Sequence, residues 1–114
     1  MKPLLIISCG LAGSGKSTIL KQLAVQSPNV VYIDKDTINE AFLSYFFEQK
    51  KSKEFYNEHI KEQTYRAMFG LARDNLLLGK HVILDGYFID KIKTKFFQEL
   101  NALVQTIPHQ KKVI

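Results

Sequence analysis

Residues 10–18 are Gly10-Leu11-Ala12-Gly13-Ser14-Gly15-Lys16-Ser17-Thr18, and they fit the pattern G-x-x-x-x-G-K-S/T. Glycines let a loop fold around an anion, so that successive backbone N–H groups point at phosphate oxygens. The segment that follows is predicted to be a helix, which presents its unpaired N-terminal N–H groups and the positive end of its dipole to the same phosphates. This stretch therefore predicts a binding site for a nucleoside triphosphate.

The positions of this stretch have different predicted contacts. Lys16 is expected to reach the β- and γ-phosphates, and the Ser17 hydroxyl is expected to bind Mg²⁺. The residues predicted to bind the nucleotide are Gly10, Ala12, Gly13, Ser14, Gly15, Lys16, Ser17 and Thr18. An apolar run over residues 4–7 precedes the stretch, and apolar residues with helical spacing follow it over 19–23. This context is typical of a strand, a phosphate-binding loop and a helix in succession.

The rest of the chain alternates between strand and helix patterns. Strands are predicted over residues 4–9, 30–33 and 81–84, with the opening of a fourth at 112–114. Helices are predicted over 15–25, from 36 or 37 to 49, over 53–78 and over 91–104. Alternating strands and helices form right-handed crossovers in a parallel sheet. The fold class is therefore predicted to be α/β, with three layers in a single domain over residues 1–114.

Acidic residues stand at the ends of two predicted strands. Asp34 and Asp36 follow the second strand, and Asp85 ends the third. Open α/β sheets bind ligands beyond the carboxyl ends of their strands, so these residues and the glycine-rich loop are expected to share one cleft. Asp85 follows an apolar strand, which is typical of an acid that holds Mg²⁺ directly or through water; a turn cap is the alternative.

Asp36 is predicted to have a different role from Asp85. A carboxylate near the γ-phosphate can accept the proton of an attacking hydroxyl or orient that hydroxyl. The alternative is that Asp36 or Thr37 caps the following helix. Asp34 competes with Asp36 for the catalytic role.

Composition limits the partners of the chain. Its 114 residues carry 16 Lys and Arg against 11 Asp and Glu, and the net charge of +5 suits nucleotides and nucleic acid. The lysines are scattered, which is also typical of a solvated surface. The single Cys9 allows no intrachain disulfide, so a reducing, cytoplasmic location is expected. No apolar stretch is long enough to cross a membrane, so no membrane partner is expected.

Four segments taken together resemble P-loop kinases: Gly10–Thr18, Tyr32–Asp36, Leu76–Lys80 and Val82–Gly86. This group includes polynucleotide 5′-hydroxyl kinases, zeta-toxin and gluconate-kinase-like enzymes, and small proteins labelled AAA-type ATPases. The resemblance covers nearly the whole chain. It implies the P-loop NTPase fold with sheet order 2-3-1-4-5, ATP with Mg²⁺ as phosphate donor, and Lys16 and Asp36 as catalytic residues, with Asp36 activating the acceptor hydroxyl.

The sequence departs from this group in two ways. Such kinases often have an Arg three residues after the acid of the second strand, to hold the acceptor, whereas this chain has Asn39. Many also carry an Arg-bearing lid after strand 4, but no Arg follows Arg73 here. We therefore expect order 2-3-1-4 with strand 5 missing, a C-terminally incomplete domain, weak turnover, and self-association through the exposed sheet edge. The lysines that could supply charge instead are Lys91, Lys93 and Lys95.

The sequence thus predicts transfer of the γ-phosphate of ATP to a hydroxyl of a small molecule or nucleotide. One alternative is a nucleotide-binding module with little or no catalysis, and transfer of labelled phosphate to an acceptor would distinguish the two. The other alternative is a nucleic-acid end-processing protein. A steep salt dependence of oligonucleotide binding would favour that alternative.

Overall fold

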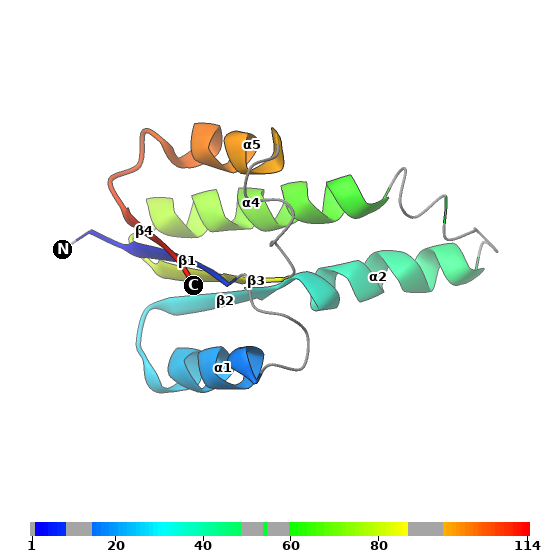
Figure 1. Cartoon of the computed structure of the whole chain (residues 1–114), viewed down its shortest axis with the longest axis horizontal. Coiled ribbons are helices and arrows are strands. Elements are labelled where there is room, and N and C mark those ends of the chain that lie inside the picture. The colour runs from blue at the N-terminus through cyan, green and yellow to red at the C-terminus, as the bar shows by residue number, and fades with distance from the viewer. Residues whose placement is uncertain (1, 9–14, 49–53, 55–59, 87–94) are drawn as a thin grey trace.

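The structure is a computed structural model that describes residues 2–8, 15–48, 54, 60–86 and 95–114. Its strands are β1 (Leu4–Ser8), β2 (Val30–Asp34), β3 (His81–Asp85) and β4 (Gln110–Val113). Its helices are α1 (Lys16–Gln26), α2 (Lys35–Glu48), α4 (Lys61–Leu77) and α5 (Lys95–Val104). Figure 1 shows three layers, with α1 on one side of the sheet and α4 and α5 on the other. No helix within the described residues is both long and apolar enough to cross a membrane.

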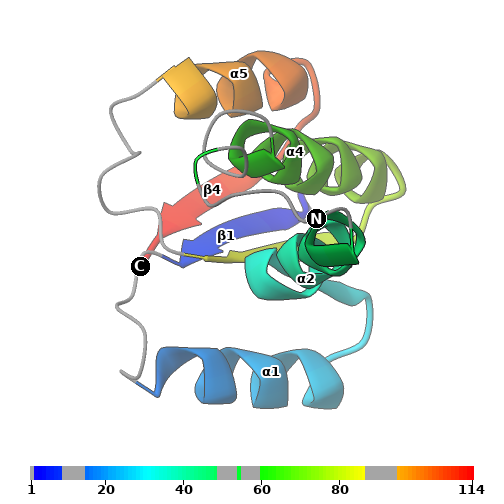
Figure 2. The ribbon, with the colours of Figure 1, turned by 90° about the vertical axis from the view of Figure 1, so that its right-hand side faces the viewer.

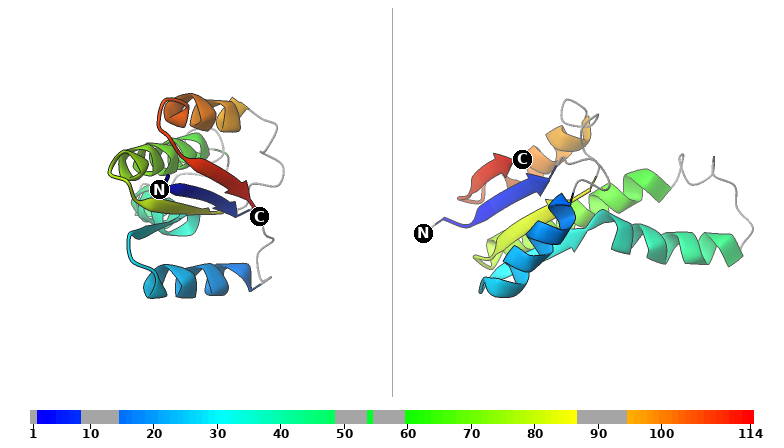
Figure 3. Two further views of the ribbon diagram at one scale, coloured as in Figure 1. Left: turned by 90° about the vertical axis from the view of Figure 1, so that its left-hand side faces the viewer. Right: turned by 60° about the horizontal axis from the view of Figure 1, so that its bottom comes forward.

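All strand pairs in the sheet are parallel, and the strand order is β2-β3-β1-β4. This confirms the expected α/β fold and strand order. Figure 3 shows β4 along the outer side of β1. The prediction for β4 was wrong in its start, because the strand begins at Gln110 instead of Lys112 and pairs with β1 from Leu4 to Ile7. All of its residues are exposed, so no apolar pattern marked the strand.

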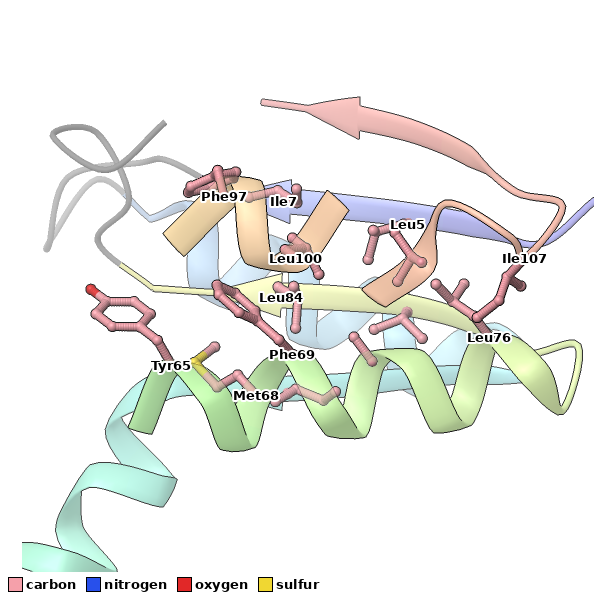
Figure 4. Close-up of a cluster of buried hydrophobic side chains, with 14 residues drawn as sticks. Leu5, Ile7, Tyr65, Met68, Phe69, Leu76, Leu84, Phe97, Leu100 and Ile107 are labelled. Atoms are coloured by element: carbon pink, nitrogen blue, oxygen red, sulfur yellow. The ribbon is translucent and has the colours of Figure 1, made fainter. Parts of the chain in front are cut away.

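The main hydrophobic core lies between the sheet and the helices α4 and α5 (Figure 4). Leu5, Ile7 and Leu84 enter it from the central strands β1 and β3. The helix α4 supplies a buried stripe that consists of Tyr65, Met68, Phe69, Ala72 and Leu76. These residues recur every three or four positions, as one face of an amphipathic helix requires. The helix predicted over 53–78 is therefore confirmed for residues 61–77.

Replacing Phe69 with alanine is expected to lower the free energy of unfolding by about 3–5 kcal/mol, because a large buried ring would leave a cavity. The Phe69 ring centroid lies 6.2 Å from that of Tyr65 and 6.4 Å from that of Phe97. Urea unfolding measures the change. The matched control is Leu77→Ala on the same helix, where the side chain is 64% exposed and an effect below about 0.5 kcal/mol is expected. Equal losses in the two variants would contradict this core.

The opposite face of the sheet is covered by α1 (Figure 2). Leu20 is the buried residue of this helix, whereas Ile19, Leu23 and Val25 are exposed. Alternate residues of a strand share a face, so the residues of β2 and β3 that do not enter the main core point toward α1. The acidic ends of these two strands belong to this second face.

Candidate nucleotide-binding site

The last residues of three strands form one row at the carboxyl edge of the sheet. The register pairs Ser8 of β1 with Asp85 of β3, and Asp85 with Asp34 of β2. Tyr32, two residues before Asp34, belongs to the same face. This is the edge at which the chain leaves β1 toward the glycine-rich loop. Four of the residues predicted to bind the nucleotide lie outside the described residues: Gly10, Ala12, Gly13 and Ser14.

The N-terminus of α1 has the features of an anion site. Gly15 precedes the helix with φ of 81°, a left-handed conformation that glycine adopts without strain. Gly15 has no side chain to cap the first turn that follows, and the N–H groups and the dipole at a helix N-terminus favour an anion. Lys16 is half-buried at this end, and Ser17 and Thr18 are exposed beside it. The predicted phosphate-binding residues from 15 to 18 thus lie at this helix terminus.

Tyr32 joins the two predicted metal ligands. Its hydroxyl donates a hydrogen bond to Oδ2 of Asp85, a carboxylate that is only 7% exposed. The Ser17 hydroxyl lies close enough to the Tyr32 phenol to lower its pKa by hydrogen bonding. Burial of the phenol raises the pKa of Tyr32 above its ordinary value, and the charges of Asp85 and Asp34 add to this, whereas the Ser17 hydrogen bond lowers it. The phenol is therefore neutral and able to donate its hydrogen at physiological pH.

Ser17 and Asp85 fit a magnesium ion by their chemistry. One hydroxyl and one carboxylate are hard oxygen ligands, and Mg²⁺ is usually held by one or two protein groups together with phosphates and waters. Ser8, beside Asp85 in the register, has a buried Oγ with no hydrogen-bond partner among the described residues. A buried polar atom without a partner is costly in a folded chain, and it marks this edge as a place where a polar ligand is favourable.

Asp34 caps α2. The helix begins at Lys35 directly after β2, without an intervening loop. Oδ1 of Asp34 accepts the backbone N–H of Asp36 at 3.0 Å, and Oδ2 accepts the Thr37 hydroxyl at 3.4 Å. The alternative that Asp36 or Thr37 caps this helix is therefore wrong, because Asp34 stands one residue before the helix and accepts the N–H of Asp36 and the hydroxyl of Thr37. Asp36 is exposed in that turn.

Lys35 is the charged neighbour of Asp36. Its ammonium lies 5.5 Å from the centroid of the buried Tyr65 ring. Burial lowers the pKa of Lys35, the negative charge of Asp36 opposes this effect, and the positive charge of Lys61 adds to it. The Asp36 carboxylate is thus within electrostatic range of the Lys35 ammonium at the start of α2.

Asn39, at the position where similar kinases often have an Arg, contacts α4. The buried Thr64 hydroxyl lies 3.2 Å from Oδ1 of Asn39 and 3.1 Å from the carbonyl oxygen of Ile60. Figure 3 shows α2 and α4 extending side by side past the sheet. Residue 39 therefore joins the two helices in this structure. Lys91, Lys93 and the side chain of Lys95, which could replace the missing Arg, lie outside the described residues.

The hydrogen bond between Tyr32 and Asp85 was not predicted from the sequence. Tyr32 lies in a strand whose other residues are mostly β-branched, where an aromatic residue is typical and predicts no special role. The only available signal was its position two residues before Asp34, which places its hydroxyl on the face of the acidic row. The hydrogen bond to Asp85 joins residues 53 positions apart.

The sheet order and the helices on both faces of the sheet are those expected for a P-loop kinase-like domain. A family model described as an AAA domain matches residues 5–107, and the chain belongs to this family. No curated protein matches the chain.

Solved structures share the fold. The crystal structure of a candidate kinase from Chloroflexus aurantiacus has a TM-score of 0.73 at 21% identity, over 98% of this chain and 58% of that one. A structure of the Pnkp1/Rnl/Hen1 complex has a TM-score of 0.58 at 23% identity, over 97% of this chain and 35% of that one. A second structure, of the Pnkp1/Rnl/Hen1 RNA repair complex, has a TM-score of 0.58 at 25% identity, over 97% of this chain and 32% of that one. The chain thus spans a little over half of the first chain and about a third of the others.

Proposed function

We propose that this domain binds ATP with Mg²⁺ and transfers the γ-phosphate to a hydroxyl group of a small molecule or nucleotide. The observation that carries the proposal is the juxtaposition, at one sheet edge, of the uncapped N-terminus of α1 with Ser17 and the buried Asp85. Lys16 and the backbone N–H groups of the loop bind the phosphates, and Ser17 and Asp85 hold the metal. Mg²⁺, when bound by Ser17 and Asp85, would offset the negative charge of the phosphates.

Asp36 is the residue proposed to orient the acceptor hydroxyl and to accept its proton. It is exposed in the first turn of α2, where the chain leaves the carboxyl edge of the sheet. Asp34 is less suited to this role, because its two carboxylate oxygens contact the first turn of α2 and its Oδ2 also lies 3.9 Å from the Lys21 ammonium. A base must be free to approach the acceptor, and Asp36 meets this condition better.

A hydroxyl at the end of a nucleic acid is a second candidate acceptor. The support for it is the likeness in fold to structures of an RNA repair complex, together with the net charge of +5. Positive charge favours polyanions through their phosphates, whatever their sequence.

Transfer of labelled phosphate tests the proposal directly. The protein is incubated with γ-labelled ATP and Mg²⁺, and separately with nucleosides, small polyols and an oligonucleotide with a free 5′-hydroxyl. A labelled acceptor that forms only with Mg²⁺ supports the proposal, and the acceptor identifies the substrate class. Label released only to water indicates an ATPase, and binding of ATP without turnover indicates a nucleotide-binding module.

A further inference from the structure

Tyr32 connects the two groups that the proposed function assigns to the metal. Its side chain is half-buried between β2 and α1, and it is flanked by the Lys21 ammonium, 5.8 Å from the ring centroid. Its hydroxyl donates a hydrogen bond to Asp85 of β3, and the Ser17 hydroxyl of α1 lies within hydrogen-bonding reach of the phenol. Tyr32 therefore links the helix that carries Ser17 with the strand that carries Asp85.

The hydrogens in this arrangement have only one consistent distribution. An ionised carboxylate is an acceptor only, so the single hydrogen of the Tyr32 hydroxyl goes to Oδ2 of Asp85. The Ser17 hydroxyl must then donate its own hydrogen to the Tyr32 oxygen. The lone pairs of Ser17 and the second oxygen of Asp85 remain for another partner. A serine hydroxyl that is free to rotate would instead present its hydrogen to a cation for part of the time.

We propose that Tyr32 is a positioning residue for Mg²⁺, which acts by orienting the Ser17 hydroxyl and the Asp85 carboxylate through this pair of hydrogen bonds. The inference rests on the proposed function, because it takes Ser17 and Asp85 as the metal ligands. Residues that hydrogen-bond to metal ligands commonly change metal affinity by about 10- to 100-fold when they are replaced. Tyr32 has this relation to both ligands at once.

The variant Tyr32→Phe removes the hydroxyl and keeps the ring. Calorimetry measures ATP affinity over a series of Mg²⁺ concentrations and in the presence of a chelator. We expect the Mg²⁺ concentration at half-maximal response to rise about 10-fold, with unchanged ATP affinity when no metal is present. The matched control is Lys21→Gln, which removes the cation beside the same ring and is expected to leave the Mg²⁺ response unchanged. In a Ser17→Ala background, Tyr32→Phe is expected to have a much smaller effect, because neighbouring residues that act together are not additive.

An unchanged Mg²⁺ response in Tyr32→Phe would overturn the inference. A lower half-maximal concentration would also overturn it, because it would show that the phenol competes with the metal for Ser17 and Asp85. Thermal melting checks that the variant is folded, and Tyr32→Met takes its place in the same titration if it is not. If the wild-type protein binds no ATP, the proposed function is contradicted as well. If the wild type responds normally to Mg²⁺ and Tyr32→Phe responds in the same way, only this inference is contradicted.

Discussion

Replacement of Lys16 with alanine is expected to reduce ATP affinity by roughly 100-fold and to abolish useful turnover. A hydrogen bond between charged groups contributes about 1.5–3 kcal/mol, and Lys16 is proposed to contact two phosphates. Lys16 is the first residue of α1 and does not belong to the described hydrophobic core, so the variant is expected to keep that core intact. Alanine is a good helix former, so the helix is expected to persist. Calorimetry with ATP and Mg²⁺ measures the loss.

Lys21→Ala is the matched control for Lys16→Ala. Lys21 is on the same helix and carries the same charge, but its ammonium is exposed and pairs with Asp34 at 3.9 Å. Exposed ion pairs contribute little to stability, so this variant is expected to stay folded and to bind ATP nearly as the wild type does. Unchanged ATP affinity in Lys16→Ala would show that the phosphate-binding assignment is wrong. Equal losses in both variants would indicate a general effect of charge instead of a contact.

The strands of the sheet and their order could be predicted from the sequence, but the start of the edge strand β4 could not. β1 and β3 are continuous apolar runs, and burial on both faces of a parallel sheet produces such runs. β4 consists of Gln110-Lys111-Lys112-Val113 and is fully exposed. It is a strand because it pairs with β1, and the Gln110 N–H also donates to the carbonyl of Pro3, just before β1, at 3.0 Å. Backbone pairing with a distant strand leaves no mark on local hydropathy.

Only those parts of the candidate site that follow from a local sequence pattern could be predicted. The spacing of Gly15, Lys16 and Ser17 gives the helix terminus, and the apolar run before Asp85 gives the acid at the end of β3. The cap of α2 was assigned wrongly because hydropathy does not show whether a loop separates β2 from the helix. Tyr32 was missed because its role depends on contacts with other elements of the fold.

Replacement of Asp36 with asparagine is expected to lower turnover by about 10²–10⁴-fold and to leave ATP affinity almost unchanged. An amide has nearly the same shape as a carboxylate, but it cannot accept the proton of the acceptor hydroxyl. The structure removes one competing explanation, because Asp34 and not Asp36 caps α2. Loss of a negative charge in the first turn of a helix costs only about 0.3–1 kcal/mol, so the variant is expected to stay folded. Steady-state kinetics with the acceptor found by labelling gives the turnover, and calorimetry gives the ATP affinity.

Asp34→Asn separates the two acids at the start of α2. Asparagine caps helices about as well as aspartate does, so this variant keeps the cap and removes only the charge. If Asp36 activates the acceptor, turnover falls steeply in Asp36→Asn and stays near the wild-type value in Asp34→Asn. The reverse result would transfer the role to Asp34, although its carboxylate already contacts the helix and Lys21. Wild-type turnover in both variants would mean that neither acid accepts the proton, and that catalysis by this domain depends on positioning and electrostatic stabilisation of the phosphates alone.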